Sequence, residues 1–70
     1  MSAVLKINGQ EKTFDAGLPE TLDKLLAELK IDAATVVAEI DGQIIERAAF
    51  ARTPLQQGQS IELIRFVGGG

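Results

Sequence analysis

The chain has 70 residues and a formal net charge of −3, and it contains no cysteine, histidine, tyrosine or tryptophan. A chain this short forms one small domain, and without cysteine and histidine it lacks disulfides, the commonest metal ligands and the usual acid–base group. Its acidic and basic residues are interspersed, whereas proteins that bind nucleic acid cluster their lysines and arginines. We therefore predict a cytoplasmic protein that is not an enzyme and binds no cofactor, metal, nucleic acid or membrane.

The N-terminal segment predicts a β-hairpin. Val4–Ile7 alternates in polarity, which places Leu5 and Ile7 on one face of a strand. Asn8-Gly9 follows, and this pair is a strong signal for a two-residue hairpin turn because both residues tolerate positive φ. Lys12–Phe14 is predicted to be the returning strand, and the charges around it suit the edge of a sheet.

One amphipathic helix is predicted from about Glu20 to Lys30, after a loop that ends at Pro19. Four leucines recur at the i, i+3, i+4 and i+7 spacing that forms one helical stripe, namely Leu22, Leu25, Leu26 and Leu29. We interpret this stripe as core, since a small sheet has no other element to cover it.

The middle of the sequence predicts a second hairpin. Val36–Ile40 is the third strand, Asp41-Gly42 has the same turn chemistry as the first hairpin, and Gln43–Glu46 is a short fourth strand. The segment Arg47–Arg52 loses the alternating pattern, and we expect Phe50 to anchor it to the core.

The last strand, Ile61–Val67, is the most continuously apolar and is predicted to lie in the centre of the sheet. The pattern as a whole predicts an α+β fold, with a small mixed sheet of about five strands and one helix packed on one face. We expect the following residues to face the helix: Ile61, Leu63, Leu5, Ile7, Val36 and Ala38. Ile64 and Phe66 then point to the uncovered face, together with Val4 and Val37. We interpret Ile64, Phe66 and Val67 as a candidate surface for docking a partner.

Three glycines, Gly68–Gly70, follow the last strand and end the sequence. A glycine run has no Cβ atoms, so it fits a channel too narrow for side chains, and no helix follows it to form a phosphate-binding loop. The reactive group is the terminal carboxylate of Gly70, which is ionised and a poor electrophile until a partner activates it. We therefore divide the chain into a folded domain, residues 1–67, and a flexible tail, residues 68–70.

Five features occur together along this chain: Ile7-Asn8-Gly9, the leucine helix, Asp41–Ile45, Thr53-Pro54-Leu55 with Gly58, and Phe66–Gly70. Through these features the whole chain resembles the ThiS family, which has the ubiquitin-like β-grasp fold. Departures from the family's usual pattern are Asp41 in place of Asn, Glu46 in place of Pro and Phe50 in place of Trp. We interpret these three as turn or packing substitutions that affect details of partner fit.

The resemblance implies a sulfur carrier of thiamine thiazole biosynthesis that is monomeric when free. A ThiF-type adenylating enzyme, related to ubiquitin-activating enzymes, would use ATP and magnesium to convert Gly70 to an acyl-adenylate. Gly68 and Gly69 would form the inserted tail. Sulfur taken from cysteine by a desulfurase would then give a thiocarboxylate, which donates its sulfur to a ThiG-type thiazole synthase.

Three other functions remain open at the level of sequence. The first is another β-grasp sulfur carrier, such as the small subunit of molybdopterin synthase, although that family tends to be longer and has prolines before its tail. A ubiquitin-like modifier would be joined through Gly70 to lysines of target proteins. A purely structural domain would carry the glycines only as an artificial extension.

Overall fold

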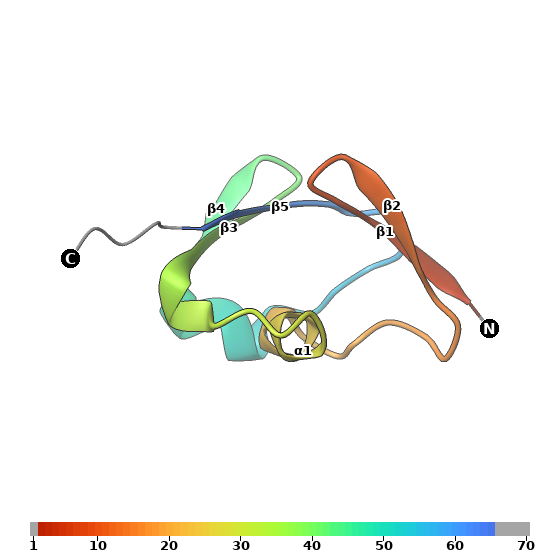
Figure 1. The fold of residues 1–70 in the computed structure, drawn as a ribbon, viewed down its shortest axis with the longest axis horizontal. Coiled ribbons are helices and arrows are strands. Elements are labelled where there is room, and N and C mark those ends of the chain that lie inside the picture. Colours follow the sequence, from red (N-terminus) through yellow and green to blue (C-terminus); the bar gives the residue numbers. More distant parts are fainter. Residues whose placement is uncertain (1, 66–70) are drawn as a thin grey trace.

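The computed structural model describes residues 2–65, which form a five-stranded sheet with a helical layer on one face (Figure 1). The strands are β1 (Ala3–Ile7), β2 (Gln10–Phe14), β3 (Val36–Ile40), β4 (Gln43–Ile45) and β5 (Ser60–Arg65). The helical layer consists of α1 (Leu22–Glu28) and two 3₁₀ helices, η1 (Ala33–Thr35) and η2 (Arg47–Arg52). No helix within residues 2–65 is long and apolar enough to cross a membrane.

The sheet order is β2-β1-β5-β3-β4, so the last strand lies between the two hairpins. β5 pairs in parallel with β1 and antiparallel with β3, and the pairs within each hairpin are antiparallel. These findings confirm the predicted α+β class, the mixed sheet with one main helix and the central position of the last strand.

Both predicted hairpin turns are present, with positive φ at both residues of each turn, as a type I′ turn requires. The φ angles are 51° and 83° at Asn8 and Gly9, and 49° and 87° at Asp41 and Gly42. A two-residue turn fixes the register, so Ile7 pairs with Gln10 and β2 begins directly after the turn. The predicted strand, which began at Lys12, was therefore too short at its N-terminal end.

The helix is shorter than predicted at both ends. Thr21 is extended, with φ −141°, and it forms an isolated bridge with Pro54, so Glu20 lies outside the helix. At the other end Lys30 has a φ of 59°. The Lys30 N–H donates to the Ala27 carbonyl at 3.1 Å and the Ile31 N–H donates to the Leu26 carbonyl at 2.9 Å. This pair of bonds is a Schellman motif, which ends the helix with lysine at the position usually taken by glycine.

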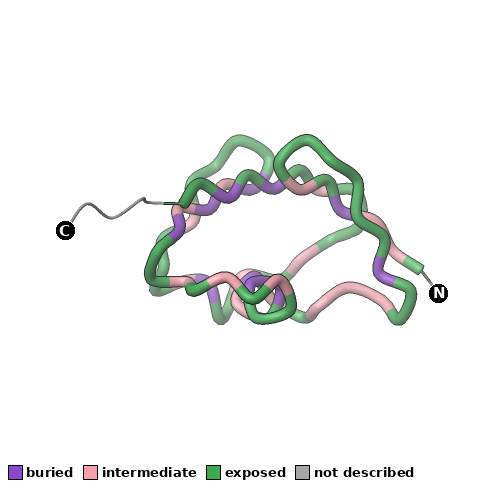
Figure 2. Tube along the Cα trace, viewed as in Figure 1, coloured by how far each residue is buried: buried purple, intermediate pink, exposed green. Residues whose placement is uncertain are grey.

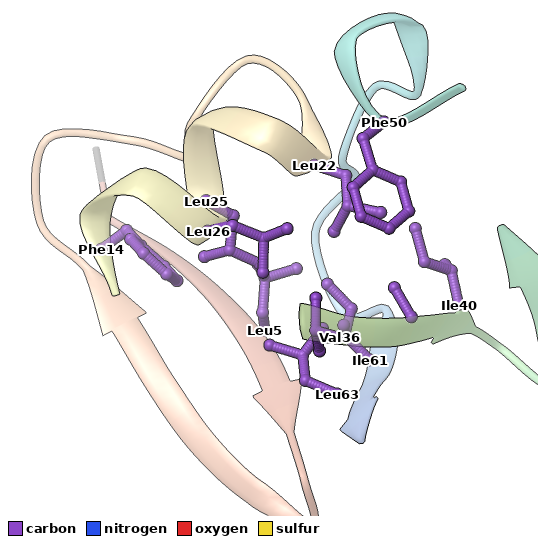
Figure 3. Close-up of a cluster of buried hydrophobic side chains, with 11 residues drawn as sticks. Leu5, Phe14, Leu22, Leu25, Leu26, Val36, Ile40, Phe50, Ile61 and Leu63 are labelled. Carbon is purple, nitrogen blue, oxygen red and sulfur yellow. The ribbon is translucent and has the colours of Figure 1, made fainter. Parts of the chain in front are cut away.

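The core lies between the sheet and the helical layer, where the buried residues of Figure 2 line both inner surfaces. Figure 3 shows its side chains, which come from every strand except β4 and from both α1 and η2. The buried residues are Leu5, Phe14, Leu22, Leu25, Leu26, Val36, Ala38, Ile40, Phe50, Ile61 and Leu63. The predicted core face and the anchoring role of Phe50 are confirmed, while Ile7 and Leu29 are only partly buried against this cluster.

Replacement of Leu26 by alanine is expected to destabilise the fold strongly, because Leu26 is 1% exposed and its loss leaves a cavity. The expected loss is about 2–5 kcal/mol, which rivals the roughly 3–5 kcal/mol that the core of so small a domain supplies. Leu29→Ala is the matched control on the same helix, and it should cost less because Leu29 is partly exposed. Urea unfolding followed by circular dichroism measures both losses, and equal losses would contradict the assignment of Leu26 to the core.

Candidate functional site

Among the residues predicted to form the site, Ile64 lies in β5 and is half exposed. Phe66, Val67 and Gly68–Gly70 lie outside the described residues. The structure therefore defines the site through the strand that leads into them and through the surfaces beside that strand.

On the side of β3, the backbone of β5 is held by Asp41 of the second hairpin turn. The Asp41 N–H donates to the Ser60 carbonyl at 2.8 Å. The Ser60 N–H in turn donates to Asp41 Oδ1 at 2.9 Å. In a continuing antiparallel ladder, a backbone carbonyl would accept the bond from the Ser60 N–H. Here the Asp41 carboxylate accepts it, because β3 ends at Ile40 and the chain enters the turn.

On the side of β1, Asn8 of the first hairpin turn makes the corresponding contacts. The Asn8 N–H donates to the Ile61 carbonyl at 2.9 Å, and the Leu63 N–H donates to Asn8 Oδ1 at 2.7 Å. Both turns therefore fix the position of β5 as well as reversing the chain. The sequence predicted the turns but not these bonds. The sequence did contain one signal for these bonds. The first residue of each turn, Asn8 or Asp41, has a side-chain oxygen that can accept a hydrogen bond, whereas a glycine there would have none.

The sheet face opposite the helix carries apolar side chains, and we define three of them, Val37, Ile44 and Ile64, as the open-face patch. Val37 pairs with Ile64 across β3 and β5, and Ile44 pairs with Glu39 and so lies diagonal to Val37. Ile44 is 69% exposed and Ile64 is 51% exposed. The exposure of Ile64 confirms the prediction that it points away from the helix.

Ile44 was absent from the predicted docking surface. Because neighbouring residues of a strand point to opposite faces, the sequence indicated only that one of Ile44 and Ile45 points away from the helix. Ile45 packs against the core, so Ile44 must point to the open face. The sequence alone did not settle which of the two adjacent isoleucines faces the helix.

Two carboxylates lie beside the open-face patch. Glu39 and Glu62 are directly opposite one another in the β3–β5 register, on the same face as Ile64. Like charges at such positions repel each other and reduce the stability of the sheet. The open face therefore places apolar side chains beside two carboxylates, a combination that suits contact with an apolar surface that also presents arginine or lysine.

A hollow of about 410 Å³ lies beside the first hairpin turn. It is lined by Ile7, Asn8, Gln10, Glu11, Lys12 and Leu29. The apolar side chains of Ile7 and Leu29 and polar side chains from the start of β2 line it together. Within residues 2–65, no group of three or more histidine, cysteine, aspartate or glutamate residues is placed to hold a metal.

The ThiS family model matches residues 4–70, which is nearly the whole sequence. The chain belongs to the ThiS family. A crystal structure of a thiamine biosynthesis protein, ThiS, from Geobacter metallireducens has 35% sequence identity and a TM-score of 0.82. That comparison covers 96% of this chain and 99% of the other. A solution NMR structure from the same organism has 35% identity and a TM-score of 0.79, covering 96% of this chain and 87% of the other.

A third relative of this ThiS-family chain is a thiazole synthase from Paramagnetospirillum magneticum, which is 35% identical over 66 residues. The match includes 94% of this chain but 20% of the synthase, so the chain spans about a fifth of that relative's length. These comparisons confirm the resemblance that the sequence indicated and the β-grasp fold that it implied.

The bond between Asn8 and β5 can be tested with two substitutions at Asn8. Asn8→Gly keeps the positive φ favourable but removes the acceptor for the Leu63 N–H, and we expect a loss of about 1 kcal/mol. Asn8→Asp keeps both the acceptor and a side chain that tolerates positive φ, and it should remain close to the parent protein. Urea unfolding gives the stabilities, and hydrogen exchange should be faster at the Leu63 amide in Asn8→Gly. An unchanged Leu63 exchange rate would show that this bond does not hold β5.

Proposed function

We propose that this protein is a sulfur carrier in thiamine thiazole biosynthesis, and that Gly70 is the residue that receives the sulfur. The observation that carries this proposal is the ThiS family match, which extends through Gly70 and so includes the whole glycine tail. The similarity to ThiS proteins of thiamine biosynthesis along 96% of the chain supports the same role.

The first chemical step is activation of the Gly70 carboxylate by a partner. An ionised carboxylate resists attack by a nucleophile, whereas its mixed anhydride with AMP has a good leaving group. A ThiF-type adenylating enzyme supplies ATP and magnesium; the carboxylate oxygen attacks the α-phosphorus and pyrophosphate leaves. The carrier contributes no catalytic group to this step and is its substrate.

The second step replaces one carboxylate oxygen by sulfur. A persulfide that a desulfurase forms from cysteine attacks the acyl carbon through its outer sulfur and AMP leaves, which gives an acyl disulfide. A thiol reductant then cleaves the S–S bond, is itself oxidised to a disulfide, and leaves a thiocarboxylate on Gly70. Gly68 and Gly69 serve as the inserted tail, since residues without Cβ atoms pass through a narrow channel in an extended form. The folded domain, residues 1–67, presents this tail to its partners.

The acceptor of the sulfur in this proposal is a ThiG-type thiazole synthase. Support comes from the Paramagnetospirillum magneticum thiazole synthase, which contains a segment that is 35% identical to this chain. We further propose that the carrier is cytoplasmic and monomeric when free, and that it meets the adenylating enzyme, the desulfurase and the synthase in turn.

The open-face patch, extended by Phe66 and Val67, is the docking surface in this proposal. An exposed apolar group close to the reactive tail is suited to contact with a partner enzyme. The opposed carboxylates of Glu39 and Glu62 add a preference for a positively charged partner surface.

Intact mass spectrometry tests the chemistry at Gly70. After incubation with the adenylating enzyme, ATP, magnesium and a sulfur donor, the protein should gain the mass difference between sulfur and oxygen, with the gain located on Gly70. Deletion of Gly69-Gly70 should abolish the gain. Gly69→Val should also block it, because the branched side chain widens the inserted segment and restricts its backbone.

Matched controls omit either ATP or the sulfur donor, and neither should produce the sulfur gain. A tail-deleted protein that still supports thiamine synthesis in cells lacking their own carrier would refute the proposal. An adenylate that never proceeds to sulfur, accompanied by conjugates on lysines, would identify a ubiquitin-like modifier instead.

The docking surface is tested by Ile64→Asp, which places a charge in the open-face patch while the core stays unchanged. We expect weaker binding to the adenylating enzyme by calorimetry, because burying that charge at an apolar contact is costly. Ala48→Asp is the matched control, since Ala48 is exposed in η2 and lies away from the sheet. Equal affinities of the two variants, with both folds verified, would remove the open-face patch from the interface.

A further inference from the structure

The two neighbours of β5 do not accompany it over the same length. β3 pairs with β5 from Ile61 through Arg65, whereas the parallel pairing with β1 includes only Ser60 and Ile61. The β1 side of the ladder ends at Asn8, whose side chain accepts the bond from the Leu63 N–H. Beyond Leu63, β5 is thus paired on one side within the described chain, residues 2–65.

The direction of each backbone group in β5 follows from the hydrogen bonds on its two sides. Ser60 exchanges bonds with Asp41 on the β3 side, while Ile61 and Leu63 bond to Asn8 on the β1 side. Because successive residues of a strand point their N–H and C=O groups to alternate sides, Arg65 is directed to the β1 side as well. Among residues 2–65, the Leu63 carbonyl and both backbone groups of Arg65 therefore form a short open edge.

The hollow beside the first hairpin turn shares one residue, Asn8, with this open edge. Asn8 belongs to both, because it lines the hollow and also bonds to the last β5 amide that β1 reaches. A strand laid along the open edge would occupy the position that β1 leaves at its turn. Its alternate side chains would point to the helix side of the sheet, where Ile7 and Leu29 line the hollow.

We propose that the open edge of β5 receives an extended segment of the adenylating enzyme, which adds a strand to the sheet. This inference rests on the proposed function and names the backbone contact by which that partner engages the carrier. Gly68 follows Arg65 by three residues, so an enzyme that holds the tail must approach this end of β5. In this type of recognition, main-chain hydrogen bonds supply affinity and pockets for alternate side chains supply specificity.

The position of Arg65 allows the backbone donor to be removed without disturbing the β3 ladder. Arg65 pairs with Val36 at a position where the two residues exchange no ladder bonds, so its N–H faces the open edge. Proline is tolerated in a strand where the N–H faces away from a neighbour, and Arg65→Pro removes this donor. Arg65→Ala is the matched control, because it removes the same side chain and keeps the N–H.

Calorimetry with the ThiF-type adenylating enzyme compares these two variants. We expect Arg65→Pro to bind about five- to tenfold more weakly than Arg65→Ala, as the loss of one backbone hydrogen bond predicts. Equal dissociation constants, with both variants folded, would overturn the inference. Adenylation of the parent protein, followed by mass, reports separately on the proposed function.

Hydrogen exchange on the unsubstituted protein gives a second measurement that does not depend on how the proline variant folds. The Arg65 amide should exchange quickly in the free carrier and at least tenfold more slowly in the complex. The Ile64 amide, which faces β3, should be protected in both states. An Arg65 amide that stays unprotected in the complex, or that is protected in the free carrier by dimerisation, would overturn the inference. Absence of any binding to the enzyme would overturn both this inference and the proposed function.

Discussion

The structure depends on the placement of β5 between two hairpins, and on the four hydrogen bonds by which Asn8 and Asp41 hold it there. Each turn residue uses its backbone N–H and its side-chain oxygen on the same strand. Parallel pairing with β1 and antiparallel pairing with β3 then bring Ile61 and Leu63 onto the helical layer. The core, the open sheet face and the direction in which the chain leaves the domain all follow from this one arrangement.

The two faces of the sheet differ in their roles, because within residues 2–65 the helical layer covers only one of them. The helical layer buries the leucines of α1 and Phe50 of η2, so this side supplies the stability of a small domain. The other face supplies exposed apolar groups and the opposed pair Glu39 and Glu62, whose repulsion lowers stability. A like-charged pair beside an apolar patch fits a surface whose favourable contacts are made with a partner rather than within the domain.

Periodicity and turn chemistry were sufficient to predict the element order, the core face and the central strand, because these depend on local patterns such as Asn8-Gly9 and the leucine stripe. The limits of the helix were not predictable in the same way. Thr21 leaves the helix to pair with Pro54, a contact between residues far apart in sequence, and Lys30 adopts a positive φ that its side chain does not signal. The same limit applies to the site. The bonds from Asn8 and Asp41 to β5, and the open edge beyond Leu63, depend on pairing between strands that are far apart in the sequence, so local patterns did not predict them.

The sheet order also determines when this domain can fold. β5 is the last strand to be synthesised and the middle strand of the sheet, so the hairpins β1–β2 and β3–β4 have no common partner until residues 60–65 are available. Pairing β1 with β5 closes a loop of nearly the entire chain, and such non-local closure slows folding relative to helical domains of similar size. Residues 60–65, which lead into the tail, therefore complete the domain that folds cooperatively. A chain truncated within β5 is expected to aggregate rather than to act as a partly active carrier.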